Sequence, residues 1–287
     1  MVELGSKYKI GIRRFGSVNW IGVWTLYQKE VLRFLNVWIQ TIFSPLISAL
    51  LFLLVLSLAI GSGRGDVLGV PFINFLAPGL IAMQVIQQSF SHSSSSFMIG
   101  KIQGNIVDIL YAPLSAGEVT FAVTLAAVTR SIMIAVISII TFHLIVEIEI
   151  KHYLSLIVFT FLSSFILGAL GIVAGLWAEK FDHMATVTNF VIVPLSFLSG
   201  TFYTIDRLPG FLHTVSQSNP FFYMIDGFRY SFIGVADGSI MIGLIYLSAL
   251  SFIMWNLNLM TRDKLIDSNA QCLINRGGNG VNQEVLW

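Results

Sequence analysis

The stretch Tyr153–Ala178 has the sequence YLSLIVFTFLSSFILGALGIVAGLWA and contains no charged residue. A helix needs roughly 20 consecutive, mostly apolar residues to cross the hydrocarbon core of a bilayer. This stretch is long enough, and five others in the chain resemble it in length and composition. We therefore expect six membrane-spanning helices, at Asn36–Ile60, Phe72–Phe90, Val119–Val146, Tyr153–Ala178, Met184–Tyr203 and Ser239–Leu259.

The overall composition is that of a membrane protein. Of the 287 residues, 55% are hydrophobic and 11% are charged, and the mean hydropathy is +0.81. A soluble globular chain carries about 25% charged residues. Transmembrane β-strands would be short and strictly alternating, whereas these apolar segments are long and continuous. The sequence thus predicts an all-α integral membrane protein, and its net charge of +1 gives no reason to expect a nucleic-acid partner.

The distribution of lysine and arginine predicts the orientation of the helices. Cytoplasmic loops of membrane proteins carry an excess of these residues. The two ends of the chain and the breaks after the second and fourth predicted spans hold eleven of them, and the other loops hold four. We expect both termini to be cytoplasmic, which is consistent with an even number of spans. The expected organisation is a cytoplasmic segment at 1–35, a six-span domain at 36–260 and a polar, disordered tail at 261–287.

Two segments near the cytoplasmic face are amphipathic. In Val18–Leu35, aromatic and apolar residues recur every three or four positions, which predicts a helix lying in the membrane interface. It could serve as an anchor for the first span or have a mechanical role. In Gly100–Glu118, an apolar stripe ends at Pro113 and predicts a second short helix. That helix could lie on lipid or dock in a groove on another protein.

A third segment, Thr204–Gly238, lies on the predicted outer side. It contains prolines, glycines and several aromatic residues. It is too interrupted to cross the membrane and too apolar for a solvated loop. Two short helices that enter the outer leaflet fit this composition, provided that protein or a water-filled cavity covers the broken backbone.

Catalytic motifs are missing from the sequence. There is no phosphate-binding loop of the form G-x-x-x-x-G-K-[S/T] and no H-E-x-x-H zinc motif. The five histidines are scattered without ligand-like spacing, and the single cysteine, Cys272, can form neither an internal disulfide nor a thiolate cluster. We expect no metal site, no cofactor bound by this chain and no enzymatic activity of its own.

Polar residues inside the predicted spans have two interpretations. Gln84, Gln87 and Gln88 lie in the second span, the run Ser93–Ser96 lies in its cytoplasmic continuation, and Arg130 lies near the middle of the third span. They could line a hydrated substrate path, where Arg130 would meet an anionic group. They could equally satisfy helix carbonyls and allow close helix packing. The carboxylates lie at the span edges, which argues against an ion-coupled transporter.

Four stretches resemble a known family. They are Thr25-Leu-Tyr-Gln-Lys-Glu30-Val-Leu-Arg33-Phe leading to Pro45, Phe75-Leu-Ala-Pro78-Gly79, Gly104–Glu118, and Pro194–Pro209 followed by Asn219-Pro220 and Asp226-Gly-Phe-Arg229-Tyr. The chain resembles the permease subunits of bacterial type-2 ABC exporters, which carry polysaccharides, nodulation factors or drugs. The run Ser93–Ser96 is more polar than the family pattern, and the tail after Asp267 has no counterpart in it.

The resemblance implies roles for the three unusual segments. Val18–Leu35 would be a connecting helix, and Gly100–Leu114 a coupling helix that seats on a separate ABC ATPase. Thr204–Ile233 would form re-entrant helices of an outer gate. The residues implied for ATPase coupling are Gln103, Ile106, Ile109, Leu110, Pro113 and Leu114. Those implied for the outer gate are Gly200, Phe202, Asp206, Asn219, Pro220, Asp226 and Arg229.

The resemblance also implies partners and a location. Such a permease would work in the bacterial inner membrane as a homodimer with two ATPase subunits, which bind the ATP and Mg. It would export an amphipathic, lipid-linked or hydrophobic substrate. The alternatives are a secondary transporter or channel not powered by ATP, and a membrane scaffold or membrane-embedded enzyme.

Overall fold

The computed structural model describes residues 18–60, 65–105, 112–146, 148–205 and 208–278. Within these ranges all regular structure is helical, apart from one isolated bridge between Val67 and Val70. This confirms the all-α prediction for the described part of the chain. The α-helices are α1 (Trp20–Leu35), α2 (Ser44–Ile60), α3 (Phe72–Ile102), α5 (Ala116–Val146), α6 (Tyr153–Trp177), α7 (Phe181–Val187), α8 (Val193–Leu198), α9 (Gly210–Ser218), α10 (Pro220–Ile233) and α11 (Ile240–Gly278). Short π-helical segments, Ile39–Phe43 and Thr188–Ile192, lead into α2 and join α7 to α8.

Five helical segments are long and apolar enough to cross a membrane. Among the described residues these are Ile39–Ala59, Ala116–Val146, Tyr153–Trp177, Phe181–Leu198 and Ile240–Met260. They correspond to five of the six spans expected from the sequence. The fifth expected span begins earlier than predicted, at Phe181, because α7 and α8 are continuous through the π-helical segment.

The remaining expected span, Phe72–Phe90, lies in α3, which is a different kind of helix. It continues to Ile102 and its glutamines and serines make it less apolar than the other five. Most of its length is buried, because it packs against α5 and α6 and, at its first turns, against α10. A helix surrounded by other helices needs no apolar surface toward lipid, so its side chains can be polar.

Close packing of α3 against α6 explains the serine run. A Cβ atom at Gly171 would lie 2.6 Å from the carbonyl oxygen of Phe90, and one at Gly175 would lie 2.8 Å from that of Ser94. Small residues on both helices therefore let the backbones approach, as is common between membrane helices. Ser89 adds a hydrogen bond to Ser131 of α5, with 2.5 Å between the two hydroxyl oxygens. These contacts give the serines a packing role.

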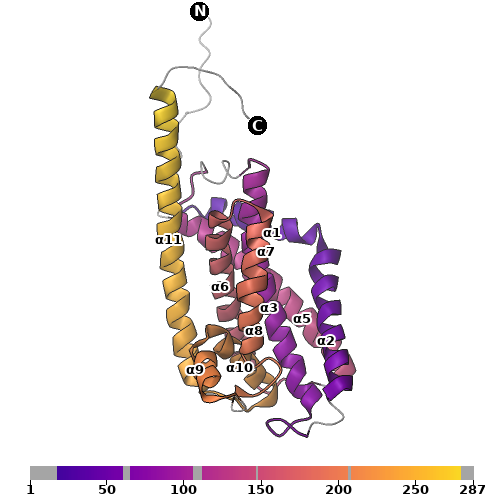
Figure 1. The fold of residues 1–287 in the computed structure, drawn as a ribbon. Helices are drawn as coiled ribbons and strands as arrows, with labels where there is room; N and C mark the ends of the chain where they lie inside the picture. The colour runs from indigo at the N-terminus through magenta and orange to yellow at the C-terminus, as the bar shows by residue number, and fades with distance from the viewer. Residues whose placement is uncertain (1–17, 61–64, 106–111, 147, 206–207, 279–287) are drawn as a thin grey trace, which may run out of the picture.

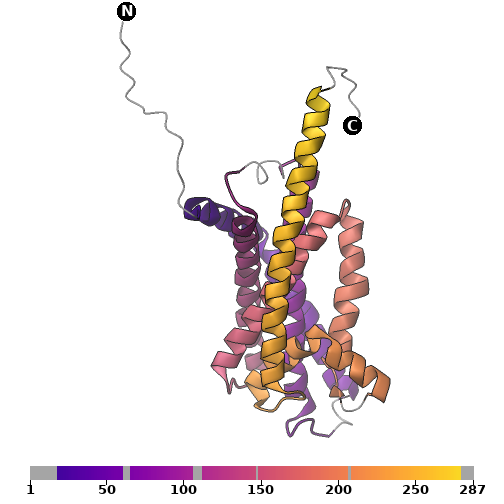
Figure 2. The ribbon, with the colours of Figure 1, turned by 90° about the vertical axis from the view of Figure 1, so that its left-hand side faces the viewer.

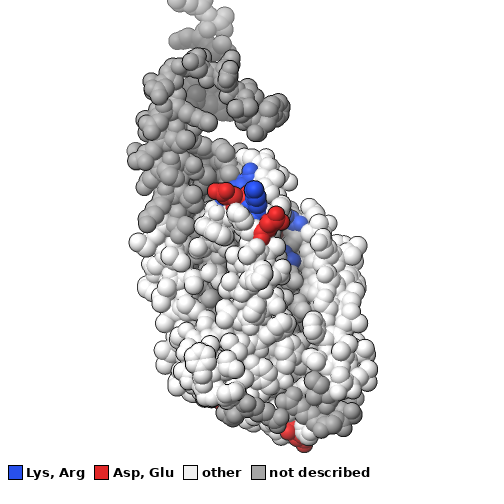
Figure 3. Space-filling model, in the orientation of Figure 1, with Lys and Arg blue, Asp and Glu red and all other residues white. Residues whose placement is uncertain are grey.

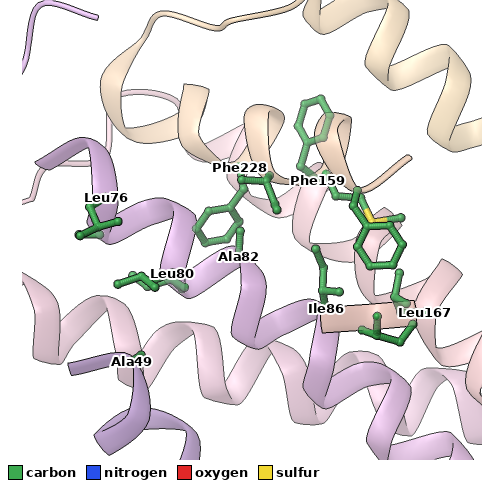
Figure 4. Close-up of a cluster of buried hydrophobic side chains, with 14 of the residues drawn as sticks. Ala49, Leu76, Leu80, Ala82, Ile86, Phe159, Leu167 and Phe228 are labelled. Atoms are coloured by element: carbon green, nitrogen blue, oxygen red, sulfur yellow. The ribbon is translucent and has the colours of Figure 1, made fainter. Parts of the chain in front are cut away.

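The hydrophobic core surrounds the first half of α3. Apolar side chains from α2, α3, α6 and α10 meet there in one cluster (Figure 4). Its labelled members are Ala49, Leu76, Leu80, Ala82, Ile86, Phe159, Leu167 and Phe228, all of which are almost fully buried. This cluster fixes the short helix α10 against the long helices.

The helices divide the molecule into two ends (Figures 1 and 2). Helix α1 and the C-terminal part of α11 lie at one end, and α9 and α10 lie at the other. On the face shown in Figure 3, most charged side chains gather toward the α1 end, and a broad uncharged surface separates them from an acidic residue at the opposite end. This arrangement is typical of a protein whose middle lies in lipid.

Helix α11 extends beyond the bundle. The sequence interpretation expected a disordered tail from residue 261, but α11 is helical through Gly278. An established span removes the cost of helix nucleation for the residues that follow it.

Candidate functional site

A buried arginine occupies the centre of the α10 end. Arg229 of α10 is 1% exposed, and its guanidinium donates a hydrogen bond of 2.6 Å to the carbonyl oxygen of Gly200. The same guanidinium lies over the ring of Phe75 in α3, 4.0 Å from the ring centroid. One side chain thus joins α10, the turn after α8 and the start of α3. We call Phe75, Gly79, Gly200, Asp226 and Arg229 the outer cluster.

The turn after α8 has a conformation that requires glycine. Gly200 has φ +76°, in the left-handed region that other residues rarely adopt. The next residue, Thr201, presents its carbonyl oxygen to Gly79, where a Cβ atom would lie only 2.8 Å from it. The pair Pro78-Gly79 and the turn at Gly200 are therefore in direct contact, although they are far apart in the sequence.

Two further polar residues hold α10 in place. Asn219 caps the helix through its side-chain oxygen, which accepts from the N–H of Phe221, and its amide nitrogen donates to Leu195 and Ser199. Pro220 occupies the first position of the helix, where its missing N–H costs nothing. Asp226 accepts hydrogen bonds of 2.9 Å from the backbone N–H groups of Asp237 and Gly238. The N-terminus of α10 is thereby attached to the end of α8, and its middle to the loop that precedes α11.

The structure brings together most residues that the sequence assigned to the outer gate. Gly200, Asn219, Pro220, Asp226 and Arg229 all belong to α10 or to loops that contact it. Phe202 is half-buried beside Phe197, with 5.3 Å between ring centroids, and beside Phe52 of α2 at 6.5 Å. Asp206 lies outside the described residues. Phe75 and Gly79 were noted in the sequence only for their resemblance to the family, and nothing in the sequence indicated that they contact Arg229.

At the opposite end, one carboxylate connects α1 to α5. Ser115-Ala-Gly-Glu118 forms a capping box, in which Ser115 and Glu118 exchange hydrogen bonds between side chain and backbone. The other oxygen of Glu118 accepts from the backbone N–H of Asn19, which caps α1. Asn19 in turn donates from its side chain to the carbonyl oxygen of Pro113, at 3.1 Å. The segment that precedes α5 is thus attached to the first turn of α1.

The predicted ATPase-coupling residues are only partly within the described structure. Gln103 caps α3, Pro113 accepts the bond from Asn19, and Leu114 packs against α1 beside Gly22. Ile106, Ile109 and Leu110 lie outside the described residues. Of the described residues in this segment, the first continue from α3 and the last contact α1.

The contact between α1 and α5 predicts a measurable change in stability. Replacing Glu118 with alanine removes the acceptor for two helix-terminal N–H groups. We expect a loss of about 1–2 kcal/mol in the free energy of unfolding in detergent, as for other lost helix caps. The matched control is Glu149→Ala, because Glu149 is exposed and belongs to neither helix. Equal stability of both variants would contradict the role of Glu118.

The polar residues of α3 are not equivalent. Gln88 accepts a hydrogen bond of 2.6 Å from the guanidinium of Arg130. Gln84 is 7% exposed, whereas Gln87 and Gln88 are half-buried. The two residue types proposed for a substrate path, glutamine and arginine, therefore meet in space at Gln88.

Sequence reasoning missed a buried polar network between α1 and α3. Glu30 is 1% exposed and forms an ion pair of 2.9 Å with Arg33, which also donates to the carbonyl oxygen of His92 and to Ser95. His92 is fully buried, and its ring lies 3.7 Å from the Glu30 carboxylate. The i, i+3 spacing of Glu30 and Arg33 was visible in the sequence. Their contacts with His92 and Ser95 of α3 could not be inferred from the sequence.

No group of three or more metal-ligating side chains occurs among the described residues.

Comparison with known proteins identifies the family of this chain. The family model for ABC-2 type transporters matches residues 22–233, which include most of α1 and all of α10. The chain is 30% identical over 242 residues to the inner membrane transport permease YadH of Escherichia coli K12, covering 83% of this chain and 94% of YadH. It is 26% identical over 226 residues to Nodulation protein J of Rhizobium leguminosarum bv. viciae, covering 76% of this chain and 84% of that protein. These matches confirm the resemblance inferred from the sequence motifs: the chain belongs to the ABC-2 type transporter family and is a multi-pass transport permease of an ABC system.

Proposed function

We propose that this chain is the membrane subunit of an ATP-driven exporter and takes its energy from a separate ABC ATPase. Six helices cross the inner membrane in this proposal, with α3 as the sixth, and both termini are cytoplasmic. The functional unit is a dimer of two copies with two ATPase subunits that bind ATP and Mg. The substrate is an amphipathic, lipid-linked or hydrophobic molecule.

The attachment of the predicted coupling segment carries the proposal. Its C-terminal end is held by Asn19 and Glu118 to the first turns of α1 and α5. Its N-terminal end continues from α3, whose Lys101 donates to the carbonyl oxygens of Leu176 and Ala178 at the end of α6. A force applied to this segment would therefore act on α1, α3, α5 and α6 together. That is the mechanical requirement for a permease driven by a soluble motor.

The α10 end supports an outer gate at the other side. Its short helices are held by buried polar contacts, and α10 packs against α3 as well as α6. Helix α3 extends from the predicted coupling segment to the outer cluster. A displacement of α3 would therefore be transmitted to the turn at Gly200. The gate would open or close by moving α10 relative to this turn.

Substituting the predicted coupling stripe tests the dependence on an ATPase. Ile106→Asp places a charge on the apolar face expected to dock on the partner. We expect co-purification of the ATPase to fall at least about tenfold, since a buried unpaired charge costs several kcal/mol. ATP hydrolysis in proteoliposomes should lose its stimulation by the permease. Asn105→Asp, at an exposed turn position, is the control and should retain both.

Two results would contradict the proposal. One is normal ATPase binding and stimulation by the Ile106→Asp variant. The other is full transport in vesicles that lack any ATPase, which would favour a secondary transporter or channel.

A further inference from the structure

Two arginines from different helices lie along one face of α3. The guanidinium of Arg33, from α1, donates to the hydroxyl of Ser95 at 3.3 Å and to the carbonyl oxygen of His92 at 3.0 Å. The guanidinium of Arg130, from α5, donates to Gln88 at 2.6 Å. Gln88 and Ser95 are two helical turns apart, about 10 Å along the axis. Both guanidinium groups therefore contact the face of α3 that carries Gln88 and Ser95.

The charges of this cluster are not balanced within the described structure. Glu30 is its one carboxylate, and it forms an ion pair with Arg33. Among the described residues no carboxylate lies within 4.0 Å of Arg130, whose Nε atom is buried and has no hydrogen-bond partner. A positive charge and an unused N–H donor at this depth are costly unless an anion joins them.

The cluster is accessible from outside the bundle. The side chain of Arg33 is 25% exposed, and Arg130 and Gln88 are half-buried. Between the two arginines, Ser91 is exposed and Ser95 is half-buried. The hydroxyl of Ser95 donates to the carbonyl oxygen of His92 and accepts from Arg33, so an incoming group would meet the guanidinium groups, the Gln88 amide and the Ser91 hydroxyl as donors. The side chain of Gln88 uses its oxygen to accept from Arg130, so its amide N–H groups remain able to donate.

We propose that Arg33, Gln88, Ser91, Ser95 and Arg130 form a binding site for the phosphate-bearing headgroup of an amphiphile, on the face of α3 between α1 and α5. Guanidinium groups bind phosphate through paired, charge-assisted hydrogen bonds, the Ser91 and Gln88 donors satisfy its remaining oxygens, and Ser95 holds the Arg33 guanidinium in position. The site rests on the proposed function, since it specifies the substrate class as an anionic amphiphile.

Binding can be measured without the ATPase, so this test is independent of the energy source. The purified chain in dodecyl maltoside is titrated with dodecyl phosphate, and the dissociation constant is obtained from the rise in the unfolding midpoint. Dodecyltrimethylammonium, with the same tail and opposite charge, should give no rise. If the wild-type chain bound dodecyl phosphate but neither bound nor stimulated an ABC ATPase, the exporter proposal would be rejected and the binding site would stand.

Two variants test the site itself. Arg130→Gln should weaken dodecyl phosphate binding at least about tenfold, because a hydrogen bond to a charged group is lost. Gln88→Glu keeps Arg130 but gives it an internal carboxylate, which should displace the phosphate with a similar loss of affinity and without loss of folding. Lys29→Gln removes an exposed positive charge from α1 and should leave binding unchanged. Wild-type affinity in both Arg130→Gln and Gln88→Glu would overturn the proposal.

The source of the phosphate is distinguished by two further probes. Binding of inorganic pyrophosphate as tight as that of dodecyl phosphate would assign the site to a free phosphate and overturn the amphiphile assignment. Competition by phosphatidylglycerol in nanodiscs, but not by phosphatidylcholine, would assign it to a bilayer lipid headgroup and support the amphiphile. Equal binding of dodecyltrimethylammonium would mean that the tail alone binds, which excludes the site.

Discussion

An Arg229→Met variant is expected to lose about 3–5 kcal/mol of its free energy of unfolding, and with it transport activity. Arg229 is almost fully buried, and its removal leaves the carbonyl oxygen of Gly200 without its 2.6 Å donor. The buried carboxylate of Asp226, one helical turn away on α10, would lose the nearby positive charge. Breaking one partner of a buried charge cluster costs this much because the remaining charges stay desolvated. The contact with the Phe75 ring would be lost as well.

The measurement is chemical or thermal unfolding of the purified protein in detergent, with transport assayed in parallel. Arg229→Lys keeps the charge but loses the planar guanidinium over Phe75, so its loss should be intermediate. Phe211→Ala is the matched control in the neighbouring helix α9, because Phe211 is 79% exposed. If Arg229→Met unfolded at the wild-type midpoint, the outer cluster would not be the feature that holds α10.

A Gly227→Ala variant should be destabilised by at least about 2 kcal/mol, through a single added methyl group. A Cβ atom at Gly227 would lie 2.2 Å from two ring carbons of Phe159 in α6, far inside van der Waals contact. The Phe159 ring is itself 1% exposed and cannot move aside without opening the core. Overpacking of this kind typically costs about 1–3 kcal/mol, and here the obstacle is a rigid aromatic ring.

A double-mutant cycle identifies the cause. Phe159→Ala alone should cost about 3–5 kcal/mol, because it leaves a cavity. The double variant should cost clearly less than the sum of the two, with a coupling of roughly 1 kcal/mol or more, since the alanine methyl then occupies space that the ring has left. Gly210→Ala is the control: Gly210 begins α9 and has no atom within 4 Å of an added Cβ, so its stability should change little. Strict additivity in the cycle would contradict the contact.

The regular features of the fold were predictable because each depends on a local pattern. Long apolar runs such as Tyr153–Ala178 must be helical in lipid, since only a helix satisfies its own backbone within one segment. Asn219-Pro220 and Ser115–Glu118 follow cap rules that act over three or four residues. The family resemblance was visible for the same reason, because its motifs are short and contiguous.

The sequence prediction was less successful where neighbours decide the outcome. The sequence prediction treated Phe72–Phe90 as a span like the other five, whereas α3 continues to Ile102 and is less apolar than they are, and only its central position shows why its polar residues are tolerated. The tail after residue 261 has polar composition, but its backbone continues the preceding span as a helix. In both cases the environment of a segment overrides its own composition.

The sequence by itself determined the class of the protein, its family, and the number of long apolar helices to within one. Only the tertiary structure decided which residues meet: Arg229 with Gly200 and Phe75, Glu118 with Asn19, and Arg130 with Gln88. The physical reason is the distance along the sequence over which each feature is decided. Hydropathy and helix capping are set within a few residues of one position, whereas the partner of a buried charge is set by how distant helices pack.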